Sequence, residues 1–168
     1  MIARTPNDHS GGVIRNNVII RHAGMGGDVA IGVFDSPGTK VVHNTVLMNG
    51  QYPNVIEYRF ADTTGVSIVN NLGDRGAQAR DDASATLQGN VWTGAPAWFV
   101  NPVGGDLHLR PTATLAIDRG VPTPDAADDW DGEPRGGAGP PDVGADERVA
   151  GPPPPAPAPP LAPSIAPR

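Results

Sequence analysis

The 168-residue chain contains 22 glycines and 20 prolines, and its 25 valines and isoleucines stand against 7 leucines. This balance excludes a helical bundle, because β-branched side chains lose rotamer freedom in helices and fit a pleated surface better. The net charge of −6 argues against a nucleic-acid partner, no apolar run is long enough to span a membrane, and the absence of cysteine excludes disulfides and thiolate metal sites.

The first nine residues have no apolar segment of the kind that signal peptides contain, and a strand-like run follows at 13–21. We therefore expect this chain to be the C-terminal part of a longer protein, with N-terminal coils of the same protein missing from it.

A pattern of Asp-x-x-(Gly/Ser)-x-x-(aliphatic)-x-x-Asn recurs along the first ninety residues. Its copies start at Asp8, Asp35, Asp62 and Asp81, so the first two offsets are 27 residues and the third is 19. Each unit holds short runs in which every second residue is apolar, separated by turn-forming residues, and this is typical of strands and turns. One unit cannot bury its apolar face alone, whereas units stacked in register can. The sequence therefore predicts an all-β solenoid of three to four coils over residues 1–100.

Stacking the repeats predicts three columns of side chains. The inward aliphatic column contains Ile14, Val41, Ile68 and Leu87. A second wall aligns Val29, Ile31 and Val33 with Ile56, Tyr58 and Phe60. An asparagine ladder occupies one corner, where amides can bond backbone groups that a turn leaves unpaired; it contains Asn17, Asn44, Asn71 and Asn90.

The aspartates that open each repeat (Asp8, Asp35, Asp62 and Asp81) allow two interpretations. Stacked carboxylates could hold Ca²⁺, which takes six to eight oxygen ligands. Aspartate also opens β-turns that a glycine closes three residues later, and we favour this structural role. We thus expect no metal or cofactor, with calcium as the alternative.

The outward side of the second wall is the candidate binding surface. If Ile56 and Tyr58 point inward, Glu57 and Arg59 point outward, beside small residues at positions 30 and 32 of the preceding coil. A sugar chain could lie there, and the cations Lys40 and Arg15 would add to it from neighbouring strands. The alternative is a solvated ion pair, which contributes little to stability.

The C-terminal third contains four short motifs, Gly105-Asp106-Leu107-His108-Leu109, Ala116-Ile117-Asp118-Arg119-Gly120, Asp129-Trp130-Asp131-Gly132-Glu133-Pro134-Arg135 and Asp142-Val143-Gly144-Ala145-Asp146-Glu147. With the asparagine ladder, this succession resembles the right-handed parallel β-helix family of pectate-lyase-like solenoids and the segment that closes many of its bacterial members. The resemblance implies a right-handed parallel β-helix with an irregular C-terminal cap.

We expect residues 101–148 to form that cap, because a solenoid must cover its terminal coil. Arg135 would bridge Asp131, Asp118 or Asp142 through its fork of donors. The third motif also resembles part of an EF-hand loop, but Ala127 and Ala138 stand at the ligand positions 1 and 12. Residues 149–168 are proline-rich, and we expect a disordered tail or linker there.

No complete catalytic set can be assigned by motif. Family lyases typically use Lys or Arg near an acidic cluster, but Lys40 is the only lysine, and the motifs of the polygalacturonase type are absent. The resemblance implies an extracellular or cell-surface protein of the carbohydrate-active type. We predict that this chain is a scaffold or polysaccharide-binding surface. The alternatives are part of a polysaccharide lyase or glycosidase with its catalytic coils upstream, and a structural, adhesin-like spacer.

Overall fold

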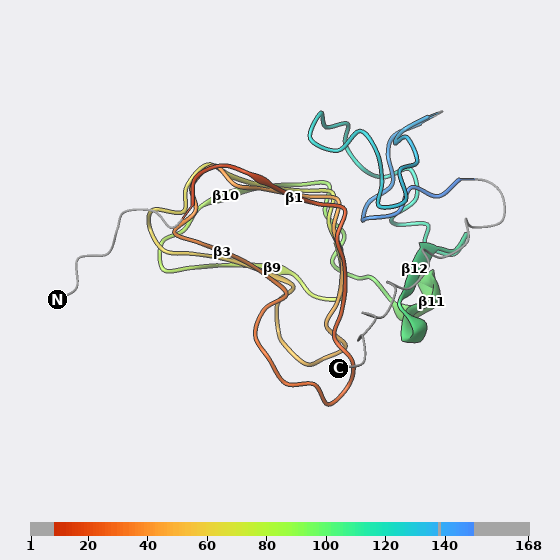
Figure 1. Ribbon diagram of the computed structural model, residues 1–168, viewed down its shortest axis with the longest axis horizontal. Helices are drawn as coiled ribbons and strands as arrows, with labels where there is room; N and C mark the ends of the chain where they lie inside the picture. The colour runs from red at the N-terminus through yellow and green to blue at the C-terminus, as the bar shows by residue number, and fades with distance from the viewer. Residues whose placement is uncertain (1–8, 138, 150–168) are drawn as a thin grey trace, which may run out of the picture.

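The computed structural model describes residues 9–137 and 139–149, and this part of the chain is all-β (Figure 1). Its only helical turns are two 3-10 helices, η1 (Pro96–Trp98) and η2 (Pro102–Gly104). None of the described segments is a helix long and apolar enough to cross a membrane. Asp8 and residues 150–168 of the predicted tail lie outside the described residues.

Three parallel sheets take their strands from successive repeats in chain order, four strands in the first sheet and three in each of the others. The first sheet contains β1 (Val13–Arg15), β4 (Lys40–Val42), β7 (Val66–Val69) and β10 (Ala85–Gln88). The second contains β2 (Val18–Ile20), β5 (Thr45–Leu47) and β8 (Leu72–Gly73). The third contains β3 (Ile31–Phe34), β6 (Ile56–Arg59) and β9 (Ala77–Arg80). Figure 1 shows the coils lying over one another with a three-sided outline, an arrangement compatible with a solenoid.

The predicted register holds in the first sheet. Ile14 pairs with Val41, Val41 pairs with Ile68, and Ile68 pairs with Leu87. Val41 and Ile68 are fully buried and Ile14 is half-buried, while Leu87 on the last strand is 42% exposed. The column therefore ends at a strand that no further described coil covers.

The predicted alignment of the third sheet was wrong by two residues. Ile31, and not Val29, pairs with Ile56. The cause is a difference in loop length, because residues 21–30 between β2 and β3 outnumber residues 48–55 between β5 and β6 by two. The chain recovers the two residues after β6, where Phe60 has a left-handed backbone (φ 75°). Phe60 is therefore half-buried beyond the strand and does not extend the inward wall.

The ladder asparagines bond one another in chain order. The backbone N and Nδ2 of Asn44 both donate to Asn71 Oδ1, at 3.0 and 2.9 Å. The same pair of bonds joins Asn17 to Asn44 and Asn71 to Asn90. Asn71 Nδ2 also donates to the carbonyl of Val41 in the preceding coil, at 2.9 Å. The ladder thus supplies hydrogen bonds that the backbone of this corner lacks.

The C-terminal segment lies against the side of the coils, which corrects the prediction of a cap over their end. It begins with an antiparallel pair, β11 (Phe99–Asn101) and β12 (Asp106–Leu109), beside the second sheet (Figure 1). Leu47 and Leu72 of that sheet pack with Phe99, Leu107 and Val143. The outer face of β5 and β8 is apolar, so it needs this cover as much as the end of the stack does.

A second corner column, which the sequence analysis did not identify, holds the segment in place. Asn16, His43 and Asn70 directly precede the ladder and have left-handed backbones (φ 56°, 52° and 55°). Asn70 donates to Val121 O at 2.7 Å and accepts from Val121 N at 2.9 Å. Asn16 Nδ2 donates to Asp128 O at 2.8 Å. Successive coils therefore each contribute a contact to the same C-terminal segment.

Candidate functional site

The four predicted binding residues do not share one surface. Glu57 and Arg59 lie on β6 of the third sheet, whereas Lys40 and Arg15 lie on β4 and β1 of the first. Lys40 Nζ bonds both carboxylate oxygens of Asp125, at 2.7 and 2.9 Å. Arg15 pairs with Asp128. The two cations therefore anchor the C-terminal segment, and the prediction that they extend the Glu57 surface was wrong.

The outward side of the third sheet, called here the β3–β6–β9 outer face, carries the positions that alternate with the buried wall. Its residues are Gly32, Phe34, Glu57, Arg59, Gln78 and Arg80. The corrected register places Gly32 and Phe34, rather than Ala30 and Gly32, beside Glu57 and Arg59. A Cβ atom at Gly32 would stand 3.0 Å from Phe34 Cζ. The glycine thus leaves room for the phenyl ring to lie across the strand.

Glu57 is buried, although the alternation predicted it to be exposed. The residue is 2% exposed, and three side chains bind its carboxylate. Tyr52 Oη donates at 3.0 Å and Asn54 Nδ2 at 2.8 Å, both from the loop between β5 and β6. Arg80 on β9 donates from Nη1 at 3.2 Å. The loop folds over the strand, so an outward-facing residue lacks contact with solvent.

These contacts decide the charge of Glu57. Burial acts to raise the pKa of its carboxyl group, but the hydrogen bonds from Asn54, Tyr52 and Arg80 outweigh burial and hold the pKa below its ordinary value. The Tyr52 hydroxyl lies beside the carboxylates of Asp28 and Glu57, and both raise its pKa. Glu57 is therefore an ionised acceptor at neutral pH that fixes the guanidinium of Arg80.

Aromatic rings border this charged cluster. Phe34 and Phe60 meet edge to face, with ring centroids 6.1 Å apart. The Arg59 guanidinium lies 4.9 Å from the centroid of the Phe60 ring and pairs with Asp81. Phe34 and Phe60 are both half-buried, so part of each ring stays accessible. The β3–β6–β9 outer face therefore combines exposed aromatic edges with two guanidinium groups.

The described aspartates at the repeat corners occupy turns. Asp35 and Asp81 have left-handed backbones (φ 45° and 50°), and Asp35 is buried. Asp62 lies in a turn, and Thr64 N donates to its carbonyl oxygen at 3.0 Å. Among the described residues, the group of histidines and carboxylates close enough to share an ion lies elsewhere, at His108, Asp131 and Asp146.

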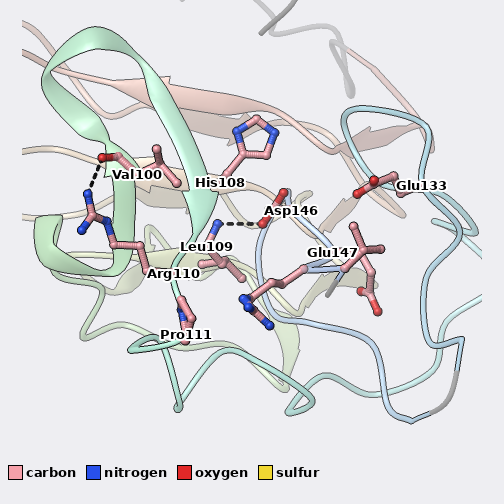
Figure 2. A pocket seen from close by; sticks show the side chains of 10 residues that line it. Val100, His108, Leu109, Arg110, Pro111, Glu133, Asp146 and Glu147 are labelled. Carbon is pink, nitrogen blue, oxygen red and sulfur yellow. Dashed lines mark hydrogen bonds between the residues drawn. The ribbon is translucent and has the colours of Figure 1, made fainter. Parts of the chain in front are cut away.

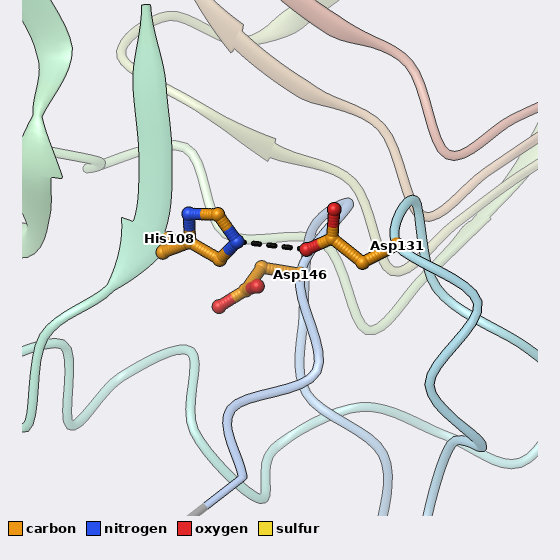
Figure 3. Close-up of side chains that lie close together, drawn as sticks. All are labelled: His108, Asp131 and Asp146. Atoms are coloured by element: carbon orange, nitrogen blue, oxygen red, sulfur yellow. Dashed lines mark hydrogen bonds and ion pairs between the residues drawn. The ribbon is translucent and has the colours of Figure 1, made fainter. Parts of the chain in front are cut away.

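That second group, called here the His108 cluster, joins three of the C-terminal motifs (Figure 3). His108 lies on β12, and its Nδ1 and Nε2 contact Asp106 Oδ1 at 2.6 Å and Asp131 Oδ2 at 2.7 Å. Asp146 Oδ2 accepts from Leu109 N at 2.7 Å. The imidazole also lies 5.0 Å, centroid to centroid, from the ring of Trp130.

The pKa values of the His108 cluster are shifted, and a cavity adjoins the cluster. Burial lowers the pKa of His108, but the bonds to Asp106 and Asp131 outweigh burial, so the net pKa is raised. Burial raises the pKa of Asp146 to about 6. His108, Asp146 and Glu133 line a cavity of about 140 Å³, whose other walls include Leu109 and Pro111 (Figure 2). Burial, with the charges of Asp129 and Asp131, raises the pKa of Glu133.

The remaining residues predicted for the cap bind backbone groups, and the predicted partners of Arg135 were wrong. Arg135 pairs with Glu147 at 3.5 Å and donates to the carbonyls of Asp128, Gly144 and Ala145. The guanidinium of Arg135 therefore links the irregular segment that contains Asp128 to the one that contains Gly144 and Ala145. Asp142 accepts from the backbone N of Asp118 at 2.7 Å and of Arg148 at 2.8 Å.

Comparison of the chain with protein-family models, with curated proteins and with solved structures finds no match. The function is therefore inferred from the geometry of the β3–β6–β9 outer face and of the His108 cluster.

Proposed function

We propose that the chain is the C-terminal part of a right-handed parallel β-helix protein, found outside the cell or on its surface, that binds polysaccharide on the β3–β6–β9 outer face. The stacked parallel sheets and the bonded asparagines support the fold, because both are features of the solenoid family that the repeats resemble. Right-handedness is the direction that crossover connections between parallel strands almost always take.

The observation that carries the proposed function is the pairing of accessible aromatic edges with fixed guanidinium groups. Phe34 and Phe60 offer apolar ring surface against which the C–H face of a sugar can pack. Arg80 uses Nη1 on Glu57, and Arg59 uses Nε on Asp81, so each retains further N–H donors. Such donors suit sugar hydroxyl groups and uronate carboxylates.

The same geometry favours binding over catalysis at this face. A general base must accept a proton, and Glu57 is a poor one because its carboxylate already accepts three hydrogen bonds and its pKa is low. Its role in this proposal is to hold Arg80 in place. The chain thus acts as a scaffold with a binding surface and without a complete catalytic site of its own.

A glycan array probed with the whole chain tests the proposal, followed by titration of the best acidic and neutral polysaccharides into wild-type protein and variants. Phe34→Ala removes a ring without a buried polar partner, and we expect its affinity to fall about tenfold or more. Arg75→Gln serves as the matched control, because Arg75 is exposed and contacts its neighbour's carbonyl. We expect its affinity to equal that of the wild type.

Two other outcomes would replace the proposal. Formation of unsaturated uronate product, followed by its ultraviolet absorbance, would make the chain a lyase. Absence of binding to every polysaccharide on the array would favour the structural spacer.

A further inference from the structure

We infer that His108, Asp131 and Asp146 form a binding site for a divalent transition-metal ion of the zinc class. The three side chains come from segments far apart in the sequence, namely β12, the turn at 129–133 and the segment 141–147. One potential ligand atom from each lies within 4.8 Å of the others. This inference does not depend on polysaccharide binding, which concerns the β3–β6–β9 outer face.

The imidazole of His108 is oriented as metal-binding imidazoles are. Metal-bound histidines nearly always give their second ring N–H to a carboxylate or carbonyl, which fixes the tautomer and the ring. Here Asp106 Oδ1 lies 2.6 Å from His108 Nδ1, and the other nitrogen, Nε2, is directed at Asp131. The His108 side chain is only 7% exposed, so it cannot turn away into solvent. Asp106 is accordingly the positioning residue of the proposed site.

Asp146 supplies a buried acceptor. The residue is 3% exposed, and Leu109 N engages its Oδ2 at 2.7 Å. Trp130 also lies within hydrogen-bond reach of this carboxylate, which borders both His108 and the cavity (Figures 2 and 3). A cation beside a buried carboxylate offsets part of the cost of removing that charge from water.

A divalent cation would offset the carboxylate charge that gathers around the cluster. Glu133 lines the same cavity, and Asp129 lies close enough to act on both Glu133 and Asp146. Without an ion, a proton shared between His108 Nε2 and Asp131 Oδ2, 2.7 Å apart, holds these two groups together. A divalent ion would replace that proton and neutralise more of the carboxylate charge.

The donor set selects the class of metal. One imidazole nitrogen with two carboxylate oxygens suits zinc and its neighbours, whereas Ca²⁺ prefers six to eight oxygens. Ligand atoms on one zinc ion stand about 3.3 Å apart, so His108 Nε2 and Asp131 Oδ2 need to separate by less than about 1 Å. Asp131 lies in a turn with Gly132 (φ 90°), where a small shift is easy. The cavity has room for water as a further ligand.

The experiment is a titration of Zn²⁺ into the full chain after chelator treatment, with metal content measured independently by elemental analysis. We expect one ion per chain and an affinity that falls by about 10–100-fold or more in His108→Gln and in Asp131→Asn. Asp106→Asn should weaken binding by about 10–100-fold while the ligand atoms remain. Co²⁺ bound in place of zinc should give a visible spectrum that changes in Asp106→Asn.

Two variants serve as matched controls. His22→Gln removes an exposed histidine on a loop, and Asp125→Asn removes a carboxylate that pairs with Lys40. Neither should change the affinity. Asp131→Asn lies on the exposed turn, so it tests the site even if His108→Gln unfolds, which circular dichroism will report.

A wild-type chain that binds no stoichiometric Zn²⁺ would overturn the inference and leave His108 as a structural imidazolium. Binding that survives both His108→Gln and Asp131→Asn would overturn it too, because the ion would then occupy another place. Tighter binding of Ca²⁺ than of Zn²⁺ would contradict the class of metal.

Discussion

Replacing Asn71 by alanine tests whether the asparagine ladder holds the coils together. Asn71 is 1% exposed, and its Oδ1 accepts two bonds from Asn44 while its Nδ2 donates to Val41 O, Val69 O and Asn90 Oδ1. The substitution leaves the buried backbone N–H of Asn44 without its partner. Each buried polar group left unsatisfied costs about 1–3 kcal/mol. With the bonds that are lost around it, we expect a loss of about 3–5 kcal/mol of unfolding free energy.

Asn17→Ala is the matched control in the same ladder. Asn17 lies in the first described coil and is exposed, and its Nδ2 donates to Arg15 O and Asn44 Oδ1. Its backbone N–H keeps the bond to Asn44 Oδ1 after the substitution. We expect a cost of about 1 kcal/mol. Urea denaturation followed by circular dichroism measures both variants. Equal losses at the two positions would refute the reasoning, because they would show that interior ladder bonds carry no special weight.

Three further predictions concern the C-terminal segment and its attachment. Burial raises the pKa of Asp142 from 3.8 to about 6, so the folded state binds this proton more tightly than the unfolded state. As pH falls from 7.5 to 4, the wild type should therefore gain up to about 3 kcal/mol of unfolding free energy relative to Asp142→Asn. Urea midpoints of the two proteins that change in parallel with pH would contradict this. Burial lowers the pKa of His43 from 6.5 to about 3, so the unfolded state binds this proton more tightly than the folded state. As pH falls from 7 to 4.5, the wild type should therefore lose about 3 kcal/mol of unfolding free energy relative to His43→Asn. The same pH dependence of stability in both proteins would count against this. Arg135→Lys keeps the charge but loses the fork of donors, so we expect it to lower the unfolding free energy by about 3 kcal/mol or more. The control Arg110→Lys, at an exposed position, should lower it by less than about 1 kcal/mol. Similar thermal unfolding of the two variants would contradict this.

The repeat could be predicted from the sequence because two of its columns obey a strict local spacing. Ile14, Val41 and Ile68 recur at the same place in each unit, and so do the asparagines that follow them. The third sheet could not be aligned this way, because its position depends on loop length. A two-residue difference between the loops 21–30 and 48–55 moves every side chain of β3 relative to β6.

The sequence does contain a signal for the side-on packing of the C-terminal segment. Val46 and Leu47 are consecutive apolar residues, and an apolar run without alternation is typical of a strand covered on both faces. In the structure, Thr45, Val46 and Leu47 are all buried. The burial of Glu57 had no local signal, because it depends on where the loop carrying Tyr52 and Asn54 folds.

The His108 cluster was equally hidden from the sequence. His108, Asp131 and Asp146 stand 23 and 15 residues apart along the chain, without metal-ligand spacing, and meet only through tertiary packing. The sequence therefore predicted no metal, with calcium as the alternative at the repeat aspartates, and placed Asp131 in the cap. Its motifs did indicate the segments that would converge, but not which of their side chains would meet.

Hydrogen–deuterium exchange of the whole chain, with and without a saturating polysaccharide from the glycan array, tests the central claim most directly. The account predicts that bound polysaccharide slows exchange of the backbone amides at 31–34, 52–60 and 77–81, which form and border the β3–β6–β9 outer face, while the segment 106–147 exchanges as before. Protection confined to that C-terminal segment, or bound polysaccharide with no protection of β3, β6 and β9, would contradict it.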